Sequence, residues 1–246
     1  MKLALSYLIL IAVAEVAGFY WGIVPCTAIH ALAILILYSY CLLAPKASCP
    51  RLAMVLGLVS MLRFFSYTLP VGLLPKIYWH VVIVIPLWIA MLLLIRHLGI
   101  SGRNLKLRMP SWRTQELLGL SGVPLSLVGY WSLRPKPLQA GDGWLGLVFN
   151  VLILMVCVGF TEEFLFRGIL QYVFEEELGR WDVVYGGVIY TVMYFSTQSL
   201  HYILFMGLAG MFFSYWVSRS RSIWGVASAH GLMVIGMGLL WPLVFT

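Results

Sequence analysis

The chain has 246 residues and is strongly apolar, with 62% hydrophobic and only 10% charged residues. Soluble domains are typically about 25% charged and about half apolar, so this composition excludes an ordinary soluble protein. The formal net charge is +7. The Lys and Arg residues are nevertheless spread over short connections between apolar runs and form no basic stripe with aromatic residues, which argues against nucleic acid as a partner.

Long apolar runs recur along the whole chain. A helix rises 1.5 Å per residue and must cross about 30 Å of hydrocarbon, so roughly 20 apolar residues can span a membrane. Polar and proline-rich interruptions leave eight apolar runs, at 3–24, 26–44, 52–74, 77–95, 115–132, 144–178, 183–199 and 201–243. The last run divides at Ser218–Ser222 into 201–218 and 222–243. We predict an all-α, polytopic membrane helix bundle of about eight transmembrane helices.

The first run also has features of a signal peptide, since Lys2 precedes it and Ala12-Val13-Ala14 mimics a cleavage site. The apolar run continues past this site to Val24, and further runs follow. We therefore expect an uncleaved first helix, and a single membrane domain over residues 1–246.

The distribution of positive charge predicts the orientation, because Lys and Arg collect in cytoplasmic loops. With the N-terminus in the cytoplasm, the outer side keeps only Lys76, Arg134 and Lys136. The cytoplasmic side receives the others outside the spans: Lys2, Lys46, Arg51, Arg96, Arg103, Lys106, Arg108, Arg113, Arg180, Arg219 and Arg221. We predict a cytoplasmic N-terminus.

Three ionisable residues lie deep within the run 144–178. This run ends in acidic residues at the cytoplasmic surface, and Glu162 lies about 20 Å from that end at 1.5 Å per residue. Glu163 and Arg167 are spaced i, i+4 and can form an ion pair on one helix face. Glu162 is rotated about 100° away from Glu163 and has no such partner.

Charged groups in hydrocarbon are costly and usually mark a functional interior. An unpaired, partly desolvated carboxylate is a plausible general base for activating water, which favours a catalytic role for Glu162. The alternative is an ion-pair network that only holds helices together. Glu15 and Arg63 are single charges in other spans, for which we expect a structural role, either paired across helices or extended toward the surface.

The segment Glu162-Glu163-Phe164-Leu165-Phe166-Arg167 resembles the E-E-x-x-x-R motif of the CAAX-protease and bacteriocin-processing family of glutamate-type intramembrane proteases. The later segments Ser222-Ile223-Trp224 and Ala227-Ser228-Ala229-His230 are similar to that family's histidine-bearing helix. The resemblance covers roughly 144–240. It implies a family-like catalytic core over 144–246, whereas the helices of 1–143 match the family poorly.

The resemblance also implies roles for these residues. Glu162 would activate a water that attacks the peptide bond, and Glu163 and Arg167 would support it. His230 would be a catalytic or oxyanion-stabilising partner.

Two positions depart from the family pattern. The middle motif, F-x-x-x-H, aligns with Tyr190-Thr191-Val192-Met193-Tyr194, so Tyr194 stands where a histidine is expected. The final motif places Val234 where Asn or Asp is expected. His201, seven residues beyond Tyr194, is a candidate to replace the histidine, or else an interfacial residue. Tyr194 itself could donate a hydrogen bond to an oxyanion, or be ordinary packing.

A metal site is an alternative at the same place, because Glu162, His201 and His230 form a conceivable Glu/His/His zinc set with an open fourth position. The chain contains no H-E-x-x-H motif, and the resemblance implies a metal-free glutamate mechanism. We therefore expect no cofactor, with zinc as the minority alternative.

We predict an intramembrane endopeptidase that cleaves a membrane-associated protein or peptide. A second hypothesis is a catalytically silent family member that binds a membrane peptide, in immunity or as a scaffold. A third is a small transporter that uses Glu162 as a proton or cation site, although paired half-repeats are not evident. We expect a multi-pass protein of a bacterial cytoplasmic membrane. The sequence does not select the substrate or the oligomeric state.

Overall fold

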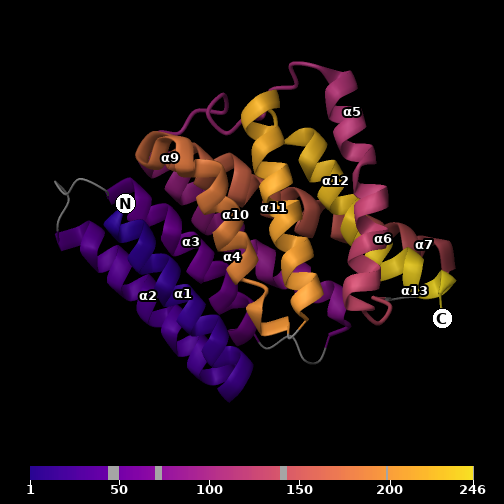
Figure 1. Ribbon diagram of the computed structural model, residues 1–246, viewed down its shortest axis with the longest axis horizontal. Helices are drawn as coiled ribbons and strands as arrows, with labels where there is room; N and C mark the ends of the chain where they lie inside the picture. The colour runs from indigo at the N-terminus through magenta and orange to yellow at the C-terminus, as the bar shows by residue number, and fades with distance from the viewer. Residues whose placement is uncertain (44–49, 70–73, 139–142, 198, 246) are drawn as a thin grey trace.

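The computed structural model describes residues 1–43, 50–69, 74–138, 143–197 and 199–245. These residues form a bundle of helices and contain no strand (Figure 1). Seven of their helical segments are long and apolar enough to cross a membrane. The predicted all-α, polytopic bundle is confirmed, and the chain is an integral, multi-pass membrane protein.

The first four helices are α1 (Lys2–Trp21), α2 (Ile23–Leu43), α3 (Pro50–Thr68) and α4 (Lys76–Leu98). The break between α1 and α2 falls at Gly22, whose φ of +88° is readily adopted only by glycine. Helix α3 packs closely on α2, because a Cβ at Gly57 would lie 2.8 Å from the ring of Tyr38. Lys46, residue 44 at the predicted end of one run and residues 70–73 of another run lie outside the described residues.

The predicted run 115–132 is divided in the structure. Helix α5 (Trp112–Leu120) ends at Ser121, and α6 (Gly122–Leu133) follows at once. At the junction, a Cβ on Gly122 would overlap with the backbone carbonyl of Ala229. The apolar pattern predicted one uninterrupted helix, because a contact with the backbone of a distant helix cannot be recognised from the local sequence. Neither α5 nor α6 is among the seven long segments.

The predicted helix 144–178 is confirmed as one continuous helical path with two irregular stretches. It consists of α7 (Gly143–Ile153), η1 (Leu154–Phe160), α8 (Thr161–Glu163), η2 (Phe164–Leu170) and α9 (Gln171–Leu178). The stretches η1 and η2 are π-helical, with wider turns than an α-helix. Such turns are frequent at functional sites, and here they flank the two glutamates on both sides.

The chain turns back at Gly179, where φ is +56°, and a 3₁₀ turn, η3 (Gly179–Trp181), leads into α10 (Asp182–Val192). Helix α10 packs against α9, and the ring centroids of Tyr185 and Phe174 lie 4.9 Å apart. It ends before the boundary predicted at 199, and a 3₁₀ turn, η4 (Phe195–Thr197), follows.

The last helices are α11 (Leu200–Ser220), α12 (Trp224–Ile235), η5 (Gly236–Leu240) and α13 (Trp241–Val244). Figure 1 shows α11 and α12 beside α10 and α6. Small residues allow α12 to lie very close to the helix of the two glutamates, because a Cβ on Gly159 would be 2.6 Å from the backbone of Gly231. This approach brings His230 into the same layer as Glu162 and Glu163.

Candidate active site

Glu162 and Glu163 are adjacent in α8 but lie in different surroundings. The side chain of Glu163 is fully buried, whereas that of Glu162 is 22% exposed. Successive residues of a helix point about 100° apart, so the two carboxylates leave the helix in different directions. One carboxylate therefore faces the interior of the bundle, and the other faces a cavity.

Glu163 is held by two positively polarised partners. Arg167 donates from Nη1 to Oε1 of Glu163 at 2.9 Å, as the i, i+4 spacing predicts, and His230 lies with Nδ1 2.8 Å from the same oxygen. Arg167 also donates to the carbonyl of Gly210 at 3.0 Å. An ionised carboxylate only accepts hydrogen bonds, so we assign the proton of a neutral His230 to Nδ1. Its Nε2 is then an acceptor that faces Glu162.

Aromatic rings surround the Arg167 guanidinium. Its central carbon lies 4.6 Å from the ring centroid of Tyr190 and 5.7 Å from those of Phe166 and Phe213. Cation–π contacts of this kind stabilise a desolvated arginine. These contacts hold the buried Glu163–Arg167 ion pair in one position next to Glu162.

Glu162 lies close to the buried side chains of Tyr190 and His230. The hydroxyl of Tyr190 donates to Oε2 of Glu162 at 3.2 Å, and the same hydroxyl lies 3.5 Å from Nε2 of His230. The same Nε2 is 3.9 Å from Oε2 of Glu162, which is too long for a direct hydrogen bond. Tyr194 in turn donates to the hydroxyl of Tyr190 at 3.2 Å. A hydrogen-bonded chain thus runs from Tyr194 through Tyr190 to Glu162.

A cavity of about 320 Å³ is lined in part by Glu162. Cys157 and Thr161 line it from the glutamate-bearing helix, and Lys76, His80 and Leu87 line it from one face of α4. Its volume is sufficient for several water molecules, each of which occupies about 30 Å³ in the liquid. Glu162 is therefore a carboxylate on the wall of a cavity that water can occupy.

The structure brings together four of the residues that the sequence analysis proposed, Glu162, Glu163, Arg167 and His230, and connects Tyr194 to them. His201 is exposed at the start of α11. Tyr190 is a member of the cluster that sequence reasoning missed. It occupies the aromatic position of the F-x-x-x-H motif, and its hydroxyl, which phenylalanine lacks, was the signal that could have identified it.

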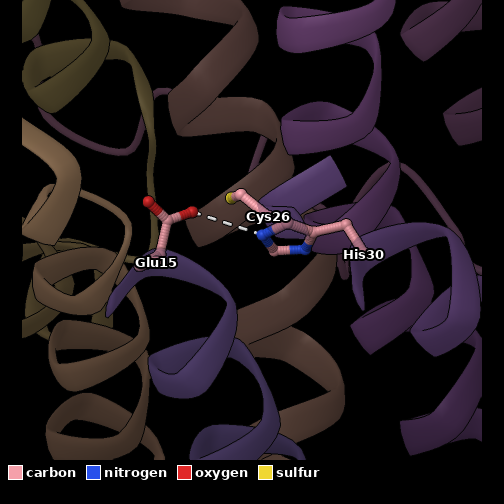
Figure 2. A group of neighbouring side chains, drawn as sticks. All are labelled: Glu15, Cys26 and His30. Carbon is pink, nitrogen blue, oxygen red and sulfur yellow. Dashed lines mark hydrogen bonds and ion pairs between the residues drawn. The ribbon is translucent and has the colours of Figure 1, made fainter. Parts of the chain in front are cut away.

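The described residues bring one group of possible metal ligands close together, and it is a different one from Glu162, His201 and His230. Figure 2 shows Glu15, Cys26 and His30, whose ligand atoms all lie within 4.8 Å of one another. Arg63, however, donates to both oxygens of Glu15 at 2.6 Å, and His30 lies 3.2 Å from one of them. Since Arg63 already balances the carboxylate charge, we interpret this group as an ion-pair network.

Of the two alternatives for Glu15 and Arg63, the structure shows the pairing across helices. Arg63 also donates to Ser196 of η4 at 3.1 Å. The network therefore connects the N-terminal helices to the turn that follows Tyr194.

A cluster of two glutamates, an arginine and a histidine, on helices long and apolar enough to cross a membrane and beside a cavity, is the arrangement that the sequence resemblance implied. Residues 144–236 match the family described as type II CAAX prenyl endopeptidase Rce1-like. The predicted resemblance to CAAX proteases is thus confirmed over this segment, which includes the whole cluster. No curated protein and no solved structure matches the chain.

Proposed function

We propose that the protein is an intramembrane endopeptidase in which Glu162 activates a water molecule to hydrolyse a peptide bond. The observation that carries this proposal is the convergence of Tyr190 and His230 on Glu162, which lines a cavity. Arg167 neutralises the charge of the second carboxylate, Glu163. Two adjacent carboxylates in different environments suit two roles, one as base and one as support.

The 3.9 Å gap between Glu162 and His230 suits one bridging water. Such a water donates one proton to Oε2 of Glu162 and the other to Nε2 of His230. As Glu162 takes up its proton, the water oxygen attacks the carbonyl carbon of the substrate. The C–N bond then breaks, and Glu162 returns the proton to the leaving nitrogen, so that the products are a carboxylic acid and an amine. This mechanism uses side chains and water alone.

The other residues position these groups. Glu163 holds Nδ1 of His230 and thereby orients its ring, and Arg167 fixes Glu163. Tyr190 donates to the carboxylate of Glu162, and Tyr194 orients the hydroxyl of Tyr190. His201 has no role in this mechanism. The apolar residues of the cavity, such as Leu87, favour a membrane-associated protein or peptide as substrate.

Glu162→Gln tests the proposal without knowledge of the substrate. Wild-type protein and the variant are expressed in bacterial membranes, and the N-termini of the membrane proteome are compared by mass spectrometry. We expect a set of new N-termini with the wild type that is absent with Glu162→Gln. The control is Glu116→Gln, which removes an exposed carboxylate of α5 and is expected to leave the set unchanged. Identical N-termini with wild type and Glu162→Gln would contradict the proposal.

The first substrate so identified also tests the zinc alternative. Cleavage in isolated membranes is expected to continue in a strong zinc chelator if Glu162 and water suffice. Loss of cleavage that added Zn²⁺ restores would overturn the metal-free mechanism.

Tyr190→Phe is expected to lower kcat/KM by about 10- to 100-fold, because a hydrogen bond to a charged group contributes about 1.5–3 kcal/mol. Tyr194→Phe is the matched control, since Tyr194 acts only through Tyr190 and its loss should cost less. Both variants are measured with the same substrate, together with their thermal stability. A larger loss with Tyr194→Phe would place Tyr194, rather than Tyr190, against the reacting groups.

A second candidate function is peptide binding without cleavage. The observation that favours it is the departure from the family motifs at Tyr194 and Val234, which replace a histidine and an amide or carboxylate. Under this hypothesis the biological activity survives Glu162→Gln and no new N-termini form. The comparison of N-termini therefore distinguishes the two functions.

A further inference from the structure

A second cavity, separate from the one at Glu162, lies at one end of the bundle. The connection from α4 to α5 crosses this end between α9 and the start of α12 (Figure 1). The cavity has a volume of about 670 Å³. Its charged and aromatic lining residues are Arg103, Lys106, Arg108, Tyr172, Glu175 and Arg221.

The cavity carries an excess of positive charge. Lys106 and Arg221 share one carboxylate, with Nζ of Lys106 2.7 Å from Oε1 of Glu175 and Nη1 of Arg221 3.1 Å from Oε2. Within the described part of the chain, Arg103 and Arg108 form no ion pair. Four cations therefore face one anion, and two guanidinium groups are available for a ligand.

The backbone holds two of these cations in uncommon conformations. Lys106 and Arg221 have φ values of +58° and +53°, and they are two of the three non-glycine residues with positive φ among those described. Such conformations persist where the surrounding structure determines them, and they often occur at binding sites. Here the amide of Ile223 donates to the carbonyl of Lys106 at 3.1 Å, which fixes the two strained segments against each other.

The location and the chemistry favour one kind of ligand. These residues lie on the side that the charge distribution predicts to be cytoplasmic, where the adjoining leaflet carries anionic lipids, and basic pockets on that side bind lipid headgroups. The planar guanidinium group matches pairs of phosphate oxygens. We propose that this cavity binds the phosphate headgroup of an anionic lipid. Arg103 and Arg108 bind the phosphate oxygens, and Lys106 and Arg221 add to the positive electrostatic potential of the cavity.

The site also contacts the helix that carries His230. The indole of Trp224, the first residue of α12, donates to the carbonyl of Leu107 at 2.8 Å. A lipid bound by Arg103 and Arg108 therefore stabilises the connection from α4 to α5, which contacts the start of α12 through this hydrogen bond.

Lipid binding to the purified full-length protein in detergent micelles tests this proposal. The probes are phosphatidylglycerol, phosphatidylcholine and inorganic phosphate, and native mass spectrometry measures the fraction of protein with bound lipid at each concentration. Each cation near an anionic lipid contributes about a 5-fold gain in affinity, so Arg103→Gln/Arg108→Gln should weaken phosphatidylglycerol binding roughly 25-fold. The matched control, Arg113→Gln/Arg180→Gln, removes two exposed cations of the same predicted side and should change the affinity by less than about 2-fold.

Tight binding of phosphatidylglycerol over phosphatidylcholine, lost only in the Arg103/Arg108 variant, is the expected result. Equal weakening in the control variant would overturn the proposal in favour of diffuse surface charge. Equal binding of phosphatidylcholine would show that the headgroup charge is not recognised. Full competition by inorganic phosphate at similar concentrations would assign the site to a free anion rather than to a lipid.

Discussion

Arg167→Met is expected to lower the free energy of unfolding by about 3–5 kcal/mol, because removing one partner of a buried ion pair leaves an uncompensated buried charge. Glu163 is fully buried, and Arg167 is its nearest cation, with Nη1 2.9 Å from Oε1. The substitution also removes the donor to the carbonyl of Gly210. Methionine retains much of the arginine volume, so the loss reflects charge and hydrogen bonding more than an empty cavity.

Unfolding of the purified protein in mixed micelles, by titration with a denaturing detergent, measures this change. The double variant Arg167→Met/Glu163→Gln is the control, because it removes both charges, and it should recover about half or more of the lost stability. Arg167→Lys should lie between the wild type and Arg167→Met, since lysine keeps the charge but loses the planar contacts to Tyr190 and Gly210. A loss below about 1 kcal/mol for Arg167→Met would contradict a desolvated ion pair.

Local spacing was sufficient to predict part of the site. The pair Glu163–Arg167 follows from the i, i+4 geometry of one helix, and the separate direction of Glu162 follows from the 100° rotation between neighbours. The apolar runs located most helices within a few residues. These features depend only on residues close in sequence, so they can be predicted from the sequence alone.

The remaining features depend on how distant helices cross. The contact of Tyr190 with Glu162 joins residues 28 positions apart, and that of His230 with Glu163 joins residues 67 apart. The break at Ser121 is coupled to the approach of Ala229 to Gly122, which an apolar pattern does not show. The family resemblance placed His230 near Glu162, but it gave no signal for the phenolic hydroxyl of Tyr190.

Glu162→Gln is expected to lower kcat/KM by about 100- to 10,000-fold, the range in which a general base contributes. The variant keeps the shape of the side chain and can still accept a hydrogen bond from Tyr190, but it cannot take a proton from water. Because Glu162 is partly exposed, the substitution should leave the stability close to that of the wild type. Glu162→Asp keeps the charge on a shorter side chain and should retain more activity than Glu162→Gln.

The double variant Glu162→Gln/His230→Gln tests whether the two residues act on one water. His230→Gln alone should lower kcat/KM by about 100-fold, while its amide can still donate to Glu163. If both residues hold the same water, the double variant should be no more than a few-fold slower than Glu162→Gln, since residues that act as a unit are not additive. The rates are measured on one substrate, with thermal stability checked for each variant. Losses that multiply would show that His230 acts independently of the water at Glu162, which would contradict a single water held by both residues.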